Sequence, residues 1–349
     1  MTDLTQAWPR PSHPLPIAII GAGAIVRTAH LPVYRRLGFP VAGVYDVNCT
    51  TARQTATLFD VDRVFHSLDE ACSLDGVVYD LAVPGDQIVD ILKQLPEGSG
   101  VLMQKPMGRD LAEARRIRQI VHDRGLVAAV NLQLRFSPNM LALADLIRAG
   151  TLGTLVDIDV RIVIDQPWHN WTFLEGAPRL EVPYHSIHYI DAIRSFAGEP
   201  DGVYCRAVLH PELPRLRDTR SSIILDYGDR IRCSLVLNHT HRAGPRYRES
   251  LMLVEGTLGA ARLTMGVNLS YPTGPDDTME IFTDEAWRTL PLRGSWFIEA
   301  FEGPMSNLQR VIAREDNVLV SSVDDAIKTM AIVEACYESS ERGSTPIAF

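Results

Sequence analysis

The chain lacks the features that would place it on a nucleic acid, in a membrane or in a disulfide framework. Acidic residues outnumber basic ones, 43 to 34, whereas nucleic-acid surfaces need clustered positive charge. No apolar run approaches the roughly 18–20 residues that span a bilayer. The five cysteines are scattered and form no Cys-x-x-Cys pair, which favours free thiols in a reducing compartment. We therefore expect a cytoplasmic globular protein with no nucleic-acid or membrane partner.

Length and composition predict a folded protein of two domains. The chain has 349 residues, 46% of them hydrophobic, which is enough for two separate cores. Residues 1–15 are polar and rich in proline, and we expect a loose N-terminal tail there. The pattern changes near Asn131, so we predict a first domain over residues 16–131 and a second over 132–349.

The first domain alternates short apolar runs with helical patterns, which is typical of βαβ units around a parallel sheet. We predict a Rossmann-type α/β domain on this basis. The expected strands are Ile17–Ile20, Val41–Tyr45, Val77–Val83, Gly100–Met103 and Val127–Val130. The expected helices are Ala24–Leu37, Thr50–Leu58, Gln87–Gln94 and Asp110–His122.

The second domain is richer in strand patterns and predicts an α/β domain with a large, mostly antiparallel, open-faced sheet. The expected strands are Leu155–Ile164, Val203–Leu209, Ser221–Asp226, Ile231–Leu237 and Leu251–Glu255. The expected helices are Asn139–Ala149, His185–Phe196, Ser306–Arg314 and Val323–Ser340. We expect the last two helices to pack back on the first domain.

A glycine-containing turn follows the first predicted strand. Gly21 permits a tight turn, and Gly23 lets backbone N–H groups approach a pyrophosphate at the N-terminus of the next helix. Ala24 and Ile25 continue the turn, and Val26 replaces the third glycine of the dinucleotide fingerprint. That third glycine mainly sets helix–strand packing, so the turn still predicts dinucleotide binding.

Asp46 ends the second predicted strand, a little over 20 residues after the glycine turn. A carboxylate at this position accepts hydrogen bonds from the adenosine ribose hydroxyls of a dinucleotide. Val47 and Asn48 follow it, so no arginine is available to pair with a 2′-phosphate. The sequence therefore favours NAD over NADP.

The dipeptide Lys105-Pro106 follows the predicted strand Gly100–Met103. Ligands bind where parallel strands end, so a lysine here is expected near the nicotinamide end of a dinucleotide. Lys105 is then a candidate catalytic residue that bonds the reacting oxygen and stabilises developing alkoxide charge. The chain is therefore predicted to be a dehydrogenase.

With these residues in place, the chain resembles the Gfo/Idh/MocA oxidoreductase family, which includes glucose–fructose oxidoreductase and inositol dehydrogenase. The resemblance covers nearly the whole chain after Pro16. It rests on the glycine turn, His30-Leu31-Pro32, Asp46, Leu81-Ala82-Val83-Pro84, Lys105-Pro106, Asn131, Arg135-Phe136-Ser137-Pro138 and His188-Tyr189-Ile190-Asp191. It implies hydride transfer between NAD(P) and a sugar or polyol, with Val83, Pro84, Gln104, Lys105 and Asn131 at the cofactor and Arg135 at the substrate.

Three positions depart from the pattern of that family. Gln104 stands where a glutamate usually precedes the Lys-Pro pair, which removes a charge that would keep the lysine protonated. Ile88 stands where a histidine is common. Tyr184 replaces the aspartate usual four residues before the second-domain histidine, so an Asp-His pair is not carried over to this chain.

The predicted helix His185–Phe196 carries the candidate bases. We expect His188 to act as general base or proton relay, with Tyr184 bonding the substrate or taking the role of the absent aspartate. His185 lies three residues from His188, on the same face of a regular helix, and is the second candidate base. His185, His188 and Asp191 are metal-ligand types at helical spacing, but no further pair falls at a recognised metal spacing, so no metal site is expected.

Aromatic and basic residues suggest the substrate side. Trp168-His169-Asn170-Trp171 combines aromatic faces with hydrogen-bonding groups, as sugar sites do, and Trp168, His169, Trp171 and Arg179 are expected at the substrate. The alternative is that these aromatics fill a core or a subunit interface. A cluster containing Arg242, Arg246 and Arg248 would suit an anionic substrate group, and a solvated loop is the competing interpretation.

These features lead to one main functional prediction and two alternatives. The main prediction is an NAD-dependent sugar or polyol dehydrogenase that forms a homodimer or homotetramer, since an open sheet face usually needs covering. The first alternative is a redox glycosidase that oxidises a sugar transiently and shows no net NADH, an option that Gln104 and Tyr184 keep open. The second is a non-catalytic NAD and sugar sensor, which would need neither Lys105 nor His188.

Overall fold

The computed structural model describes residues 4–347, which form two compact units. The parallel-sheet unit contains residues 7–137 and 297–330, and the large-sheet unit contains residues 138–296 with short segments from both ends of the chain. The chain leaves the parallel-sheet unit after Ser137, six residues beyond the boundary expected from the sequence. Phe136 packs edge-on against Trp8 of the same unit, with ring centroids 5.2 Å apart, and this contact ties residues 132–137 to the parallel-sheet unit.

The parallel-sheet unit is built on five parallel strands in the order β2-β1-β3-β4-β5. Every residue of β1, β3 and β4 is buried, as expected for a sheet covered on both faces. The strand order reverses between β1 and β3, and this is where ligands bind in doubly wound sheets. The strands are β1 Ile17–Ile20, β2 Val41–Tyr45, β3 Val78–Leu81, β4 Gly100–Met103 and β5 Val127–Val130. All five predicted strands are confirmed, although β3 is shorter than predicted.

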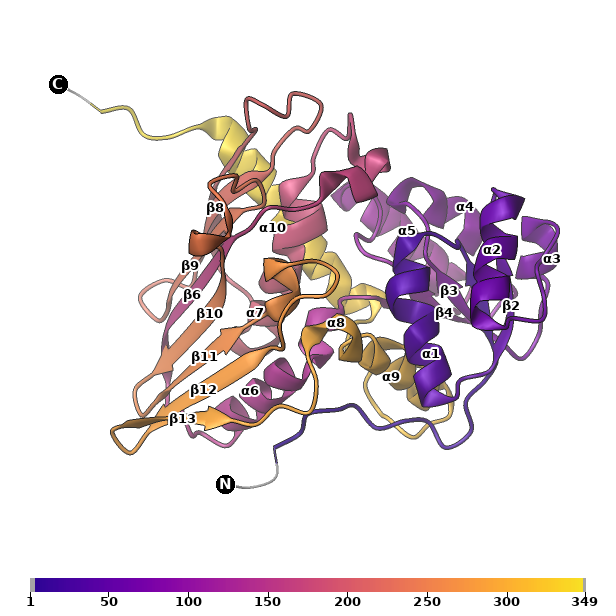
Figure 1. Ribbon diagram of the computed structural model, residues 1–349, viewed down its shortest axis with the longest axis horizontal. Helices are drawn as coiled ribbons and strands as arrows, with labels where there is room; N and C mark the ends of the chain where they lie inside the picture. Colours follow the sequence, from indigo (N-terminus) through magenta and orange to yellow (C-terminus); the bar gives the residue numbers. More distant parts are fainter. Residues whose placement is uncertain (1–3, 348–349) are drawn as a thin grey trace. The chain divides into compact units, whose positions relative to one another are not determined.

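Some helices of this unit begin at residues whose side chains cap them. Asn48 accepts N–H groups from the first turn of α2, and Asp110 accepts the N–H of Glu113 at the start of α5, which satisfies otherwise unpaired donors. The predicted helix Ala24–Leu37 differs in one respect, because residues Val26–His30 form a π-helix directly before α1, which is labelled in Figure 1. The helices are η1 Val26–His30, α1 Leu31–Leu37, α2 Cys49–Phe59, α3 Leu68–Cys72, α4 Ile88–Leu92 and α5 Leu111–Asp123.

A helix from the C-terminal part of the chain completes the core of the parallel-sheet unit. Helix α9, Glu302–Ile312, begins four residues before the predicted start and buries Met305 and Leu308 among residues of β1 and β4. Gly100 makes this packing possible, because a Cβ there would lie 2.4 Å from the Cδ1 of Ile312. Helix α9 therefore packs against the parallel sheet.

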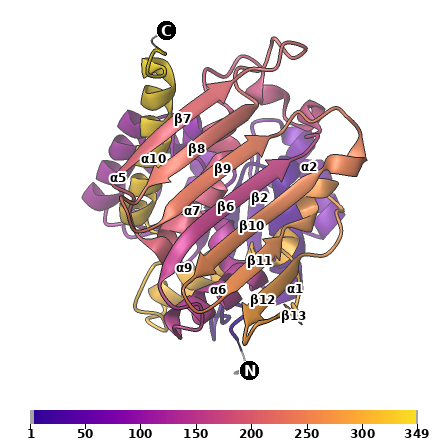
Figure 2. The ribbon, with the colours of Figure 1, turned by 90° about the vertical axis from the view of Figure 1, so that its left-hand side faces the viewer.

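The large-sheet unit contains eight strands in the order β13-β12-β11-β10-β6-β9-β8-β7. Only β6 and β9 pair in parallel, so the mostly antiparallel prediction is confirmed. The strands are β6 Leu155–Val163, β7 Gly202–Val208, β8 Arg220–Asp226, β9 Arg232–Asn238, β10 Glu249–Gly256, β11 Ala260–Thr264, β12 Thr278–Thr283 and β13 Ala286–Leu290. Strands β11, β12 and β13 were not predicted from the sequence. Helices α6, Pro138–Arg148, and α7, Ile187–Ala197, lie behind the sheet in Figure 2.

The other face of the large sheet is open and mixes apolar with charged side chains. Tyr204 and Ile224 are 63% and 50% exposed, and Arg232 forms ion pairs with Asp157 and Asp159 on the neighbouring strand. That a dimer or tetramer covers this face stays a prediction.

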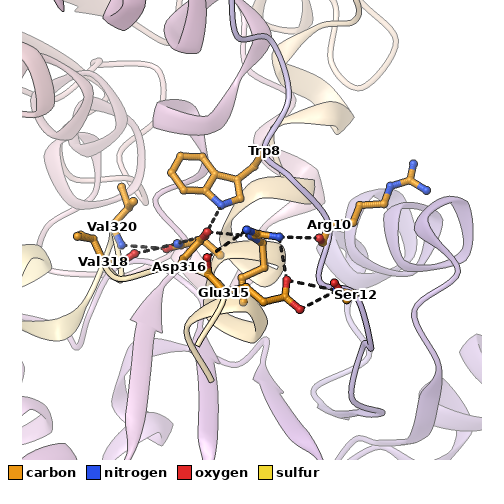
Figure 3. A network of polar contacts seen from close by, with 9 residues as sticks. Trp8, Arg10, Ser12, Glu315, Asp316, Val318 and Val320 are labelled. Atoms are coloured by element: carbon orange, nitrogen blue, oxygen red, sulfur yellow. Dashed lines mark hydrogen bonds and ion pairs between the residues drawn. The ribbon is translucent and has the colours of Figure 1, made fainter. Parts of the chain in front are cut away.

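Residues 8–12, which were expected in a loose tail, are held by hydrogen bonds. Trp8 donates its indole N–H to Asp316 over 2.9 Å, and the backbone N–H of Ser12 donates to Glu315 over 3.0 Å (Figure 3). Arg310 forms ion pairs with both carboxylates, over 2.8 Å to Glu315 and 2.9 Å to Asp316. The sequence expectation fails because these partners lie about 300 residues away, beyond the reach of any local pattern.

All five cysteines are free thiols, and three of them, Cys72, Cys233 and Cys336, are buried. Burial raises the pKa of Cys233 to about 12, which makes it a poor nucleophile. Among residues 4–347, no helix is long and apolar enough to cross a membrane.

Candidate active site

The glycine turn follows β1, and its conformation requires a glycine at position 21. Gly21 has φ +100°, and a Cβ on it would lie 2.3 Å from the carbonyl oxygen of Ala82. Gly23 is different, because no atom lies within 4 Å of its Cβ position and its surface is exposed. Ala24 is also exposed and Ile25 is half-buried. The turn therefore packs tightly on the sheet at Gly21 and is open to a ligand from Gly23 onward.

Asp46 lies beside this turn, at the end of β2. One carboxylate oxygen accepts the backbone N–H of Ala22 and the other accepts that of Asn48, both over 2.8 Å. These bonds hold the carboxylate in place and leave it only partly buried. A carboxylate accepts further hydrogen bonds through its remaining lone pairs, so Asp46 can still bind ribose hydroxyls.

The segment after β3 supplies the opposite wall of this region. Val83 is half-buried and Pro84 is exposed, and Val83 lies 3.3 Å from the Cβ position of Gly21. Ile88, which stands where the related family often has a histidine, is fully buried at the start of α4. Ile88 is therefore a core residue of this chain.

Lys105 lies just past the end of β4. The backbone N–H of Gln104 donates to the carbonyl of Leu81 over 2.9 Å, which ties this segment to β3. The Gln104 side-chain oxygen accepts the backbone N–H of Lys105 over 3.0 Å. Burial lowers the pKa of the Lys105 ammonium to about 8, because desolvation disfavours the charged form. A lysine with a pKa near neutrality is suited to proton transfer and oxyanion binding.

Asn131 is oriented by a buried chain of polar side chains. Its backbone N–H donates to Met103 over 2.7 Å, and its side-chain amide nitrogen lies 3.3 Å from Nε2 of His30. Nδ1 of His30 lies 2.7 Å from Asp80, which also accepts the hydroxyl of Tyr34 over 2.8 Å. If the Asn131 amide donates, His30 is neutral and donates to Asp80.

The buried contact between His30 and Asp80 was not predicted from the sequence. Burial and the Asp80 carboxylate raise the pKa of Tyr34 well above its ordinary value, so its hydroxyl stays a donor. The feature that could have indicated this contact is Asp80, an acidic residue within the apolar run Val77–Val83. Buried carboxylates need partners, and His30 is its partner.

Arg135 lies in the same unit and is engaged by its neighbours. Its guanidinium forms an ion pair with Asp325 over 2.6 Å and donates to the carbonyl of Val320 over 3.3 Å. The side chain is 7% exposed. These contacts join Arg135 to the first turn of the helix Val323–Arg342 and to the segment before it, and the expected substrate role of Arg135 stays a prediction.

The candidate bases of the large-sheet unit do not share one regular helix. Residues Val182–Ser186 form the π-helix η6, and α7 begins only at Ile187. The wider π-turn gives the three side chains different neighbours. The ring of Tyr184 lies 6.2 Å from that of Phe173, His185 lies 5.2 Å from Trp168, and His188 lies 5.3 Å from Trp296. The expectation that His185 and His188 lie on one face assumed an uninterrupted α-helix.

Glu181 joins His185 and His239 in a buried cluster that the sequence did not predict. Oε2 of Glu181 lies 2.9 Å from Nδ1 of His239 and 3.9 Å from Nδ1 of His185. The two imidazole rings stack with centroids 4.1 Å apart. Burial raises the pKa of Glu181, and His239 opposes that effect. Glu181 lies 58 residues before His239 along the chain, so no local pattern joins the two.

A cavity of 640 Å³ opens beside Trp168 and His169 in the same unit. Its wall also carries charged side chains, among them Glu212 and Arg242, which form an ion pair over 2.9 Å. Trp171 is not part of this wall and packs against Tyr271, with ring centroids 5.2 Å apart. The cavity combines an aromatic face with polar groups, as carbohydrate sites do.

The expected arginines are mostly engaged elsewhere. Arg179 forms an ion pair with Glu334 over 2.7 Å and lies over the ring of Tyr337, both on α10, Val323–Arg342. It is not among the residues that line the cavity, and its expected role at the substrate stays a prediction. Arg246 stacks on the adjacent Tyr247. Arg248 pairs with Asp165, so the expected arginine cluster is divided among separate partners.

Comparisons with known proteins agree with this geometry. Residues 15–132 match the family model described as "Oxidoreductase family, NAD-binding Rossmann fold", and residues 140–287 match the "GFO/IDH/MocA C-terminal domain". A D-apiose dehydrogenase of Paraburkholderia graminis is 24% identical over 94% of this chain and 88% of its own length.

Solved structures share the whole fold. An oxidoreductase from Agrobacterium radiobacter, in complex with NAD⁺, L-tartaric acid and magnesium, superposes with a TM-score of 0.80 at 17% identity, covering 95% of this chain and 98% of its own. A levoglucosan dehydrogenase, in complex with NADH and levoglucosan, superposes with a TM-score of 0.78 at 17% identity, covering 95% and 98%. At these identities the likeness concerns the fold.

Proposed function

Because the chain belongs to the Gfo/Idh/MocA family of oxidoreductases, we propose that it transfers a hydride between a hydroxyl-bearing carbon of a sugar, sugar derivative or polyol and NAD. The observation that carries this proposal is Lys105. It follows β4 of the sheet whose β1 leads into the glycine turn, and burial brings its pKa to about 8. The names of the related proteins, an apiose and a levoglucosan dehydrogenase, support a carbohydrate as the substrate.

The residues around the glycine turn fit a dinucleotide. The open space at Gly23 suits the pyrophosphate, whose charge the N-terminus of the next helix favours. Asp46 suits the two ribose hydroxyls, and no basic side chain follows it at Val47 or Asn48 to pair with a 2′-phosphate. The proposed cofactor is therefore NAD rather than NADP. When bound, NAD supplies the hydride acceptor for alcohol oxidation.

The proposed chemistry needs an oxyanion stabiliser and a base. Lys105, protonated below pH 8, donates a hydrogen bond to the reacting oxygen and stabilises alkoxide charge. His188 accepts the hydroxyl proton, and Tyr184 binds the substrate. His188 is preferred to His185 as the base because His185 lies against Glu181 and His239.

The test of this function is a cofactor-coupled substrate screen. Purified protein is incubated with NAD⁺ or NADP⁺ and with free sugars, polyols, sugar acids and glycosides, while NADH formation and aglycone release are followed in parallel. We expect NADH with one carbohydrate class and a preference for NAD⁺. Glycoside cleavage without net NADH would replace the dehydrogenase by a redox glycosidase. NAD binding without turnover of any substrate would favour a sensor.

The pH dependence gives a test specific to Gln104 and Lys105. We expect kcat/KM for oxidation to fall as pH rises through about 8, because Lys105 then loses the positive charge that stabilises the alkoxide. Gln104→Glu places a carboxylate beside Lys105 and is expected to move this fall upward by about one pH unit, since an opposite charge favours the protonated lysine.

The profile is measured from pH 6 to 10 on both proteins. Activity that instead rises through pH 8 would make neutral Lys105 the base and contradict the assigned role. An unchanged profile in Gln104→Glu would mean that the fall belongs to another group.

A further inference from the structure

We propose that Glu181, His185 and His239 form a binding site for a divalent transition-metal ion, with Zn²⁺ preferred. All three residues belong to the large-sheet unit. The site is independent of the proposed hydride transfer, because its evidence is the geometry of these three side chains alone.

The spacing of the three ligand atoms suits a small metal ion. The carboxylate oxygen and the two imidazole nitrogens all lie within 4.8 Å of one another. Zinc–ligand bonds of about 2.0–2.2 Å in a tetrahedral site place ligand atoms roughly 3.3 Å apart. The contacts of 2.9 Å from Glu181 to His239 and 3.9 Å from Glu181 to His185 bracket that value. Only small side-chain adjustments separate this cluster from a coordination site.

The second observation is a pair of buried polar atoms that hydrogen bonding leaves unsatisfied. Oε2 of Glu181 and Nδ1 of His239 are buried, and across the described part of the chain neither has a hydrogen-bond partner. They contact each other over 2.9 Å as a charge pair, but without the geometry of a hydrogen bond. Burial of a carboxylate oxygen that accepts no hydrogen bond is costly, and a cation bound by both atoms removes that cost.

The backbone holds these ligands on fixed supports. The N–H groups of Leu180 and Glu181 both donate to the Asp218 carboxylate over 3.1 Å. The other Glu181 oxygen accepts the hydroxyl of Ser186 over 3.2 Å. His239 directly follows β9, and its N–H donates to Thr219. Ligands on rigid supports lose little entropy when an ion binds.

The ligand set favours zinc over magnesium or calcium. Two imidazoles and one carboxylate are typical of zinc sites that keep an open fourth position, whereas magnesium and calcium prefer oxygen ligands throughout. His185 is 16% exposed and contacts Trp168, which lines the 640 Å³ cavity. An ion can therefore enter from the side of His185.

This cluster differs from the set considered in the sequence. His185, His188 and Asp191 do not come together as ligands, because Asp191 pairs with Arg194 over 3.6 Å and His188 packs on Trp296. The residues that do assemble come from positions 181, 185 and 239. The proposed site therefore replaces the sequence expectation of no metal.

The test is zinc binding by the full chain. Protein stripped with a chelator is titrated with Zn²⁺ against a chromophoric competitor, and bound metal is counted by mass spectrometry after dialysis. We expect one Zn²⁺ per chain, and a loss of more than about 100-fold in affinity in Glu181→Gln and His239→Gln, since even outer-shell changes cost 10–100-fold. His185→Gln, at the more exposed ligand, keeps the test valid if the buried variants fail to fold.

His122→Gln is the matched control. His122 also lies 3.1 Å from a carboxylate, that of Asp324, but its side chain is 48% exposed and it has no second imidazole. We expect this variant to retain one Zn²⁺ per chain. Less than one-tenth of an equivalent in the unaltered protein, or binding that survives His185→Gln and His239→Gln, would overturn the proposal. Because the readout is metal content, these outcomes are independent of dehydrogenase activity.

Discussion

Replacing Lys105 by methionine is expected to lower kcat by about 10²–10³-fold, the usual loss when one oxyanion donor is removed. The protein should still fold and bind NAD with affinity within a few-fold, because methionine keeps the length of the side chain and the glycine turn is untouched. Burial already disfavours the charged form of Lys105, so removing the charge does not cost stability. The measurement is steady-state kinetics with NAD titrated by fluorescence.

Lys93→Met is the control for this variant. Lys93 is 47% exposed and paired with Asp90 on the surface of the same unit, so we expect unchanged activity. Full activity in Lys105→Met would contradict both the catalytic role of Lys105 and the main support for the proposed function. Loss of NAD binding together with activity would assign Lys105 to the cofactor alone.

Alanine at Gly21 is expected to destabilise the protein by about 3 kcal/mol, combining backbone strain with a steric clash. At φ +100° a Cβ is strained, and it would also lie 2.3 Å from the carbonyl oxygen of Ala82. Ala82 is itself bonded to Ile20 across the sheet, so it cannot move away cheaply. The measurement is the urea midpoint of unfolding without cofactor, which falls if the prediction holds.

Gly23→Ala separates stability from binding in the same turn. No atom lies within 4 Å of its Cβ position, so the unfolding midpoint should change little. The added methyl group stands where backbone must approach the pyrophosphate, so NAD affinity should fall by about 10-fold or more. Unchanged NAD affinity in Gly23→Ala would remove Gly23 from the cofactor site.

Much of the parallel-sheet unit was predictable from sequence because its signals are local. Each strand is a short apolar run followed by a turn or cap, so the predicted bounds of β1, β2, β4 and β5 match the observed ones. Ligand position follows from strand direction in such sheets. The sequence alone therefore assigns the glycine turn and Lys105 to the carboxyl ends of strands.

The large sheet was predicted less completely, for physical reasons. Strand β11 offers a single large apolar side chain, Leu263, and four of the five residues of β13 are exposed. These strands form because each pairs with a neighbour already in place, not because their own sequences prefer it. The π-helix η6 likewise has no signal in residue spacing, and it changes which neighbours His185 meets.

The sequence by itself determined the family, the dinucleotide turn and the lysine at the end of β4, because each depends on residues close together along the chain. Tertiary structure alone decided which polar groups meet in the interior. Asp80 pairs with His30, fifty residues away along the chain, and Glu181 pairs with His239, fifty-eight residues away. Such pairs form because a buried charge must find a partner wherever folding brings one, and no local pattern records which partner that is.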